Sequence, residues 1–124
     1  MNPELLIQNV PAAAQSLALV VHDPDAPVEG GWTHWTVWDI DPRTSVIKEE
    51  SIPPGSTEGL NSGGKPGYMG PCPPPGAPHR YHFRLYALDA PLALPDSASV
   101  DDVQGAIAKH AIASAELVGT YGRG

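Results

Sequence analysis

The sequence predicts a single small β-rich domain with one helix near its C-terminal end. Three segments rich in β-branched and aromatic residues have the length of strands, and one later segment has the apolar spacing of a helix. Hydrophobic residues make up 41% of the chain and charged residues 17%, a balance typical of a globular domain. With 124 residues the chain has the usual length of one domain, so residues 1–124 are expected to share one core.

The first predicted strand covers residues 16–22, a near-continuous apolar run of the length expected for a buried strand. It ends where Asp23 and Pro24 open the segment Asp-Pro-Asp-Ala-Pro, which closes at Pro27. Proline cannot continue a sheet ladder and restricts the residue before it, so this segment is predicted to be a rigid turn. Either of its two X-Pro peptide bonds could adopt the cis form.

The second predicted strand covers residues 32–40, where aromatic and β-branched residues are concentrated. Strict alternation assigns one set of side chains to a common face: Trp32, His34, Thr36 and Trp38. It assigns Trp35 and Val37 to the opposite face. Because both faces carry bulky residues, this strand is predicted to lie inside the sheet and to be covered on both sides. Residues 41–44 are predicted to form a tight turn after it.

Residues 53–78 are predicted to be mostly loop, because glycine and proline recur through them. The third predicted strand covers residues 79–88. One of its faces is assigned His79, Tyr81, Phe83 and Leu85, and the other is assigned Arg80, His82 and Arg84.

The helix is predicted to begin at Ser99, which has the side chain of an N-cap, with Asp102 at the position that completes a capping box. Apolar residues at Val103, Ala106 and Ile107 then follow helical spacing. The alternating segment 115–121 is predicted to form a short final strand.

The charge and the cysteine content exclude several kinds of partner. The net charge is −7, and the seven Lys and Arg residues are scattered singly, so no basic face for nucleic acid or anionic membrane is expected. Cys72 is the only cysteine and cannot form an internal disulfide. The first residues lack the basic start and apolar stretch of a signal peptide, and no apolar run approaches membrane-spanning length, so a cytoplasmic location is expected.

Three features of the sequence are candidates for chemistry. They are the acidic turn at Asp23, the pair Trp32 and His34, and the loop that leads to His79 and Tyr81. Each lies at a strand end or beside a stiff loop, where binding sites tend to be assembled. Taken one at a time, each is more readily explained as structure: a side chain that caps a turn, a core histidine, a packed tyrosine.

Taken together, Asp23, His34 and His79 leave several functions open. They can form a pocket for an anionic group, or a metal site of two histidines and one carboxylate. A hydrolase or a metal-dependent enzyme could use the same three side chains. The proline-rich loop could instead serve as an interaction module in the polyproline II conformation. Neither a Gly-x-Ser-x-Gly nucleophile motif nor a phosphate loop occurs in the sequence.

Several motifs in this order resemble the phosphatidylethanolamine-binding protein family, also called the Raf kinase inhibitor protein family. The resemblance is carried by residues 17–27 with their aspartate-proline turn, by residues 32–35 (Trp-Thr-His-Trp), and by the Gly-Pro-Cys-Pro-Pro stretch 70–74 that leads to His-Arg-Tyr at 79–81. The ending 115–123 resembles the shorter prokaryotic branch. The resemblance covers nearly the whole chain.

The resemblance implies a β-sandwich-like core with one or two short C-terminal helices, and a small pocket for phosphate or a similar anion. Carried over position by position, the pocket comprises Asp23, Trp32, His34, Gly70, Cys72, His79 and Tyr81. His34, His79 and Tyr81 would donate hydrogen bonds to the anion, and backbone N–H groups near Gly70 would form an anion-binding nest. Asp23 would orient a pocket histidine.

The expected function is therefore that of a non-enzymatic binding or regulatory protein with no cofactor and no catalytic residue. Its ligand would be a phosphate-bearing small molecule or a phosphorylated residue, and its target a kinase or a protease. Relative to the family, the chain looks as if it lacks a first N-terminal strand. An uncovered sheet edge favours pairing between chains, so a homodimer is expected.

Overall fold

The computed structural model describes residues 5–24, 31–48, 51–67 and 79–121. Within them the chain forms seven strands and one helix. In order these are β1 (Leu5–Leu6), β2 (Ser16–Asp23), β3 (Trp32–Ile40), β4 (Val46–Ile47), β5 (Thr57–Glu58), β6 (His79–Leu88), α1 (Val100–His110) and β7 (Ala111–Tyr121).

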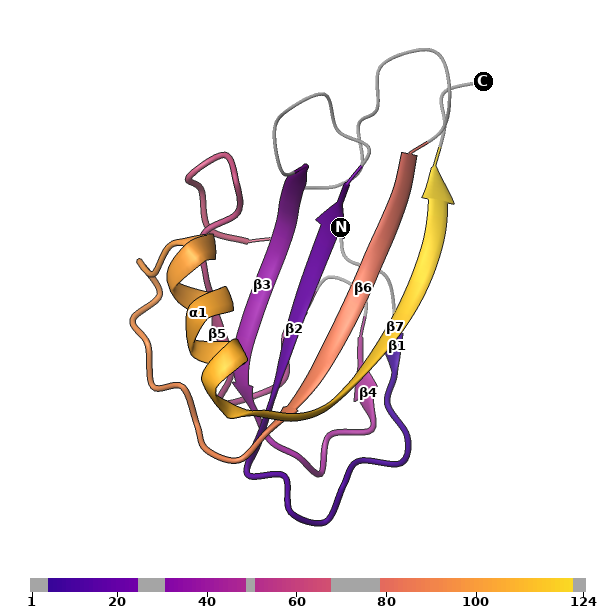
Figure 1. The fold of residues 1–124 in the computed structure, drawn as a ribbon, viewed down its shortest axis with the longest axis vertical. Helices are drawn as coiled ribbons and strands as arrows, with labels where there is room; N and C mark the ends of the chain where they lie inside the picture. The colour runs from indigo at the N-terminus through magenta and orange to yellow at the C-terminus, as the bar shows by residue number, and fades with distance from the viewer. Residues whose placement is uncertain (1–4, 25–30, 49–50, 68–78, 122–124) are drawn as a thin grey trace.

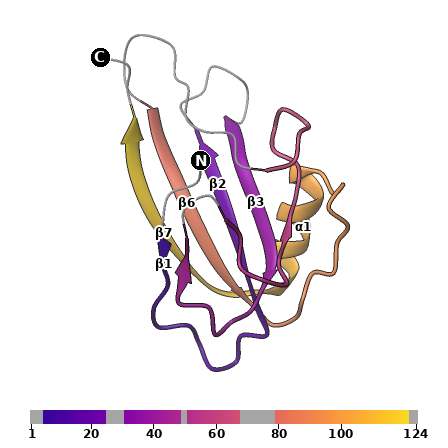
Figure 2. The same ribbon diagram turned by 180° about the vertical axis from the view of Figure 1, so that it is seen from behind.

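Five of these strands form one antiparallel sheet in the order β5-β3-β2-β6-β7, and β1 pairs with β4 in a small second sheet (Figure 1). Helix α1 covers one face of the large sheet, and the β1–β4 ribbon lies on the other face (Figure 2). The three strands expected from the sequence are β2, β3 and β6, which are neighbours in the sheet. The prediction of a mainly β domain is confirmed.

Because side chains alternate along a strand, β2 supplies both layers of the core. Leu17, Leu19 and Val21 join the cluster on the β1–β4 side, and Ala18 and Val20 join the cluster beneath α1. Every one of these five residues is at most 2% exposed. A strand buried on both faces belongs inside a sheet, as its continuous apolar sequence indicates.

Strand β3 is also covered on both sides, as expected from its bulky residues. Trp35 packs in the cluster on the β1–β4 side and Trp38 in the cluster beneath α1. Each fully buried indole finds an acceptor for its N–H, Glu58 Oε1 at 2.5 Å for Trp35 and the Leu94 carbonyl at 3.3 Å for Trp38. These hydrogen bonds satisfy the polar end of each buried ring. The predicted turn after β3 is confirmed by a hydrogen bond of 2.9 Å from Thr44 N–H to the Asp41 carbonyl.

Helix α1 has the capping box expected from the sequence. Ser99 Oγ accepts from the Asp102 N–H at 3.1 Å, and the Asp102 carboxylate accepts from the Ser99 N–H at 3.3 Å. Val103 and Ile107 are the buried residues of the helix and anchor it to the sheet.

The final strand is longer than the sequence predicted. It begins at Ala111, directly after α1, and pairs with β6 along its length, whereas alternation indicated a strand only from residue 115. Four of the five residues at 111–115 are alanine or serine, which do not favour a strand, so pairing with β6 decides the conformation of this segment. The segment predicted as loop from residue 53 also contains the short strand β5, and its part from 68 to 78 lies outside the described residues.

Candidate functional site

The end of β2 and the start of β3 meet at the position where the sequence predicted a pocket. Asp23 and Trp32 are direct cross-strand partners, and the Asp23–Pro24 peptide bond is trans. Asp23 is only 2% exposed, which is unusual for a carboxylate and requires polar partners. Gly31 makes this approach feasible, because its φ is +79° and a Cβ there would lie 2.8 Å from both Pro24 Cα and His22 Nε2.

A β-bulge at His34 determines which side chains share a face. Val21 pairs with Trp35, but the next residue, His22, pairs with Thr33, so His34 is the extra residue of β3. The strict alternation predicted for residues 32–38 is therefore wrong at this end of the strand. Thr33 lies on the same face as His22, and His22 Nδ1 is 3.0 Å from Thr33 Oγ1.

The bulge also moves Trp32 to the other face of the sheet. Trp32 lies opposite Asp23, and Asp23 follows Val21 by two residues, so the register places both on the side of Val21 and Trp35. His34 is 7% exposed and is therefore a buried histidine. It belongs to the start of β3, which pairs with the end of β2 that carries the buried Asp23. Bulges of this kind re-aim side chains at sheet ends and are common beside functional sites.

Strand β6 brings two more of the predicted residues to the same end of the sheet. The pairing of β2 with β6 ends at His22 and His82, and Tyr81 is the next residue of β6 beyond that pair. The backbones of Tyr81 and His79 pair with Gly119 and Tyr121 of β7. The backbone thus carries five of the predicted pocket residues to one end of three adjacent strands (Figure 1). The side chains of His79 and Tyr81, and the residues Gly70 and Cys72, lie outside what the structure describes.

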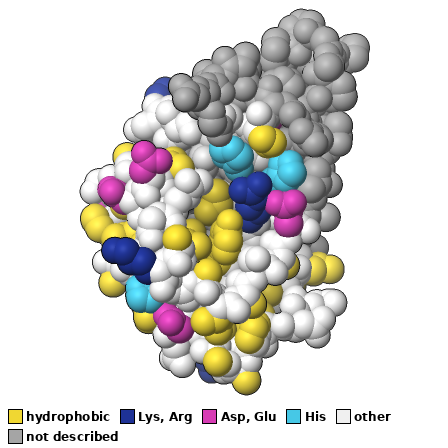
Figure 3. Space-filling model, in the orientation of Figure 1, with side chains coloured by type: hydrophobic (Ala, Val, Ile, Leu, Met, Phe, Trp, Pro, Cys, Tyr) yellow, Lys and Arg dark blue, Asp and Glu magenta, His cyan; other side chains and the backbone are white. Residues whose placement is uncertain are grey.

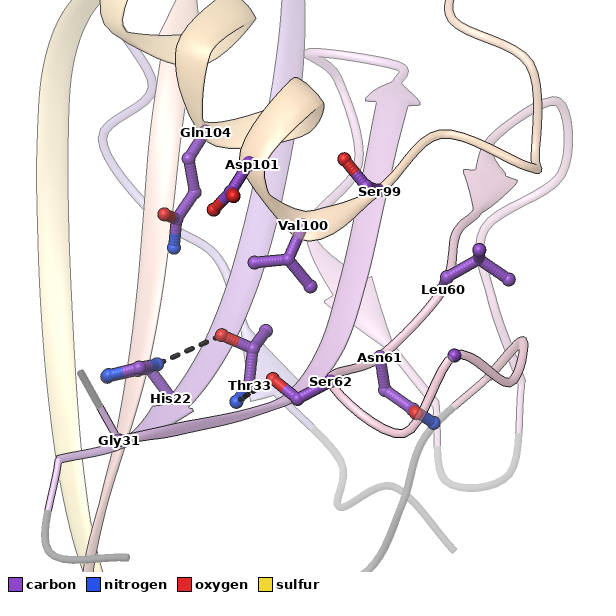
Figure 4. A pocket seen from close by; sticks show the side chains of 11 residues that line it. His22, Gly31, Thr33, Leu60, Asn61, Ser62, Ser99, Val100, Asp101 and Gln104 are labelled. Atoms are coloured by element: carbon purple, nitrogen blue, oxygen red, sulfur yellow. Dashed lines mark hydrogen bonds between the residues drawn. The ribbon is translucent and has the colours of Figure 1, made fainter. Parts of the chain in front are cut away.

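A separate cleft of about 540 Å³ opens on the helix side of the same end of the sheet. His22 and Thr33 form its floor, and Asp101 and Gln104 of α1 project toward them from the opposite wall (Figure 4). Two hydrogen bonds fasten Ser62 to β3, from the Thr33 N–H to Ser62 Oγ at 2.8 Å and from the Ser62 N–H to the Thr33 carbonyl at 2.9 Å.

Of the predicted pocket residues whose side chains the structure describes, which are Asp23, Trp32 and His34, none lines this cleft. Sequence reasoning missed it because its walls come from three distant segments, and the acidic start of α1 is explained by helix capping alone. The register places Asp23 and Trp32 on the face of the sheet opposite to this cleft. Asp23 and His34 are the aspartate and the histidine that the sequence singled out, so we regard the strand ends that carry them as the candidate functional site.

Charged side chains gather on the helix side of β6 and β7 (Figure 3). The Glu116 carboxylate accepts from Arg84 Nε at 2.7 Å and lies 3.1 Å from His82 Nδ1. The hydrogen bond from Arg84, assisted by His82, lowers the pKa of Glu116 below its usual 4.5, and the same bond raises the pKa of Arg84. Across the described ranges, no three His, Cys, Asp or Glu side chains converge as metal ligands would. This cluster therefore ties β6 to β7.

Known proteins with a similar sequence identify the family of this chain. The family model described as phosphatidylethanolamine-binding protein matches residues 1–122. A UPF0098 protein of Methanothermobacter thermautotrophicus is 46% identical over 129 residues, which covers 100% of this chain and 84% of that protein. This chain belongs to the phosphatidylethanolamine-binding protein family.

Two crystal structures of members of that family are similar to this chain in fold. A phosphatidylethanolamine-binding protein homologue from Chlamydia trachomatis has a TM-score of 0.91 and 40% identity, over 98% of this chain and 81% of the other. Escherichia coli YbcL, described as a member of the mammalian family, has a TM-score of 0.90 and 34% identity, over 98% of this chain and 79% of the other. The UPF0098 relatives form the short prokaryotic branch of the family, as the resemblance implied. In the described part of the chain, no helix is both long and apolar enough to cross a membrane.

Proposed function

We propose that this protein is a non-enzymatic binding protein whose pocket takes phosphate or a phosphorylated group at the end of β2, β3 and β6. The observation that carries the proposal is the burial of Asp23 and His34, 2% and 7% exposed, at the shared end of two paired strands. Membership of the phosphatidylethanolamine-binding protein family supports it.

The chemistry of the pocket follows from the types of its residues. A phosphate needs hydrogen-bond donors in a partly dry site, where each donor is worth more than in water. His34 would supply a ring N–H, and His79 and Tyr81 would add donors from β6. Asp23 cannot face an anion while ionised, so its role is to hold a pocket histidine in the donating form. Gly70 and Cys72 would complete the wall with backbone N–H groups.

The net negative charge of the whole protein would repel an anion that approaches this site. The net charge is −7, so long-range steering does not favour an anionic ligand. Recognition must come from short hydrogen bonds and from exclusion of water. A small pocket of this kind suits a single phosphoryl group, on a free metabolite or on a phosphorylated residue of a kinase or protease that the protein regulates.

The hydrolase or metal-enzyme alternative uses the same residues, Asp23, His34 and His79. This alternative differs from a binding protein in what can be measured. An enzyme of this kind would turn over a phosphate ester or bind a stoichiometric metal ion. Metal analysis of the purified protein, together with an assay of phosphate release from phosphoethanolamine, separates the two. We expect neither metal nor turnover.

The three tryptophans allow the pocket to be mapped by NMR, since each indole N–H gives its own signal. Titration with phosphate should move the Trp32 indole signal. The Trp35 and Trp38 indoles should stay in place, because they are buried and bonded to Glu58 and to Leu94. Phosphoethanolamine should act in the same way, and sulfate tests whether the pocket needs a protonatable anion.

Two histidine variants provide the contrast. His34→Ala should abolish the shift of Trp32, whereas His110→Ala, at the exposed end of α1, should leave it unchanged. An unshifted Trp32 in the wild type would contradict an anion pocket. If phosphate still shifts the Trp32 signal fully in His34→Ala, the pocket lies elsewhere. If phosphate shifts the backbone amide signals of Asp101 and Gln104 instead, the anion binds in the cleft beneath α1.

A further inference from the structure

His22 is a histidine that the proposed anion pocket does not use. It precedes Asp23 on β2, but its side chain lies half-buried on the opposite face of the sheet, in the cleft beside α1. There its ring Nδ1 makes a hydrogen bond of 3.0 Å with the hydroxyl of Thr33, which is only 2% exposed (Figure 4). This bond joins β2 to β3 at the residue directly before His34.

Thr33 is held at three points. Its backbone N–H donates to Ser62 Oγ at 2.8 Å, and its carbonyl accepts from the Ser62 N–H at 2.9 Å. The third point is the bond between its side chain and His22. On the other side of His34, Trp35 is fully buried. His34 therefore lies between two neighbours whose positions are fixed.

The β-bulge has two possible positions at this end of the sheet. Between the neighbouring pairs of the register, Thr33 and His34 of β3 stand against the single residue His22 of β2. In the structure Thr33 is the partner of His22, so His34 is the extra residue. If His34 were the partner instead, its side chain would share the face of His22, which is opposite to the face that carries Asp23. The hydrogen bond between His22 and Thr33 belongs to the first arrangement and therefore stabilises it.

We propose that His22 and Thr33 are positioning residues, whose hydrogen bond keeps the bulge at His34 and thereby keeps the His34 ring available to the anion pocket. Neither side chain touches the anion, because both lie on the face of the sheet opposite to Asp23. Their role in binding rests on the proposed function, whereas their effect on the position of the bulge does not. The affinity of the pocket for phosphate then depends in part on a contact on the other face of the sheet.

Thr33→Val tests the hydrogen bond at its threonine end, because it replaces the hydroxyl by a methyl group of similar size. A shifted bulge leaves fewer molecules with a competent pocket, and the apparent affinity falls with the fraction that remains. Calorimetric titration with inorganic phosphate should therefore show binding weaker by about three- to tenfold, the factor that one neutral hydrogen bond is worth. Thr33→Ser keeps the hydroxyl and should bind phosphate within about twofold of the wild type.

Thr36→Val is the matched control. Thr36 is a fully buried threonine of the same strand, and its hydroxyl lies 3.5 Å from the Leu60 carbonyl, away from the bulge. The variant loses one buried hydroxyl, as Thr33→Val does, but it should bind phosphate like the wild type. Urea unfolding identifies a temperature at which every variant is folded, and the titrations are made there, so that lost stability does not lower the affinity.

His22→Leu removes the other end of the bond and provides a second route to the same result. Cross-strand nuclear Overhauser contacts of the unliganded full chain report the position of the bulge directly. In the wild type they should join His22 to Thr33, and in His22→Leu and Thr33→Val contacts between position 22 and His34 should appear. The double variant should bind phosphate no more weakly than the weaker single variant, because the same bond is lost in each.

Wild-type contacts in both His22→Leu and Thr33→Val would overturn the proposal. So would wild-type phosphate affinity in Thr33→Val, or a loss of affinity in Thr36→Val as large as that in Thr33→Val. If the wild type does not bind phosphate but the contacts move as described, the proposed function fails, whereas the placing of the bulge by His22 and Thr33 is supported.

Discussion

Gly59→Ala should destabilise the protein strongly, although it adds a single methyl group. A Cβ at Gly59 would lie 2.5 Å from Trp38 Cη2 and 2.8 Å from Thr36 Oγ1. Trp38 Cζ3 would lie closer still, and ordinary contact begins near 3.4 Å, so the indole would have to move by about 1 Å. Trp38 is fully buried beneath α1, and its N–H is bonded to the Leu94 carbonyl at 3.3 Å, so it has little room to move.

Overpacking of a well-filled core costs about 1–3 kcal/mol, and the size of this clash points to the upper half of that range. At roughly 4 °C per kcal/mol for a domain of this size, the melting temperature should fall by about 8–12 °C. Thermal and urea unfolding followed by circular dichroism measure this change, and the urea midpoint should fall with little change in the slope.

Gly105→Ala is the matched control, because it is the same substitution at a glycine with the opposite environment. Gly105 is exposed on α1, and a Cβ there would meet nothing within 4 Å. Replacing a helical glycine by alanine should stabilise the protein by about 0.5–1 kcal/mol. If Gly59→Ala melts within about 2 °C of the wild type, a shift of under 1 kcal/mol, then the packing described around Trp38 is wrong.

Two further predictions concern the helix and the charged cluster. Ser99→Ala removes the side-chain half of the capping box and should cost about 1 kcal/mol in urea unfolding, whereas Ser99→Asp should restore most of it; equal stability of all three proteins would argue against the cap. Glu116→Gln should flatten the acid limb of the stability curve. Because Arg84 holds the pKa of Glu116 below its usual 4.5, this carboxylate stabilises the fold above that pH and loses its contribution as the pH falls through its lowered pKa. Melting temperatures at neutral and acid pH should therefore differ less in the variant than in the wild type, and an unchanged difference would show that the ion pair is not formed in solution.

Much of the fold could be predicted from local sequence signals. The apolar runs of β2 and β6 and the aromatic run of β3 are long enough to identify, and the Ser99–Asp102 capping box marks the start of α1. In each of these, local preference and tertiary environment agree. The family motifs added the expectation that Asp23, His34 and His79 lie near one another, and the strand register brings their backbones to one end of the sheet.

The features that the sequence did not reveal depend on contacts between distant segments. The bulge at His34 shifts Thr33 and Trp32 to faces opposite to those that alternation assigns, and no residue type near it marks a bulge. The early start of β7 is decided by its pairing with β6, in which Leu88 is the partner of Ala111, 23 positions further along the chain. Neither can be read from a local window.

The central claim is an anion pocket at His34, and calorimetric titration of the wild type with phosphate tests it most directly. A hydrogen bond to a charged group is worth about 1.5–3 kcal/mol, so His34→Ala should weaken phosphate binding by roughly 10- to 150-fold. His110→Ala should bind like the wild type. Wild-type protein that releases no heat of binding with phosphate or phosphoethanolamine, or a His34→Ala variant with unchanged affinity, would contradict the account.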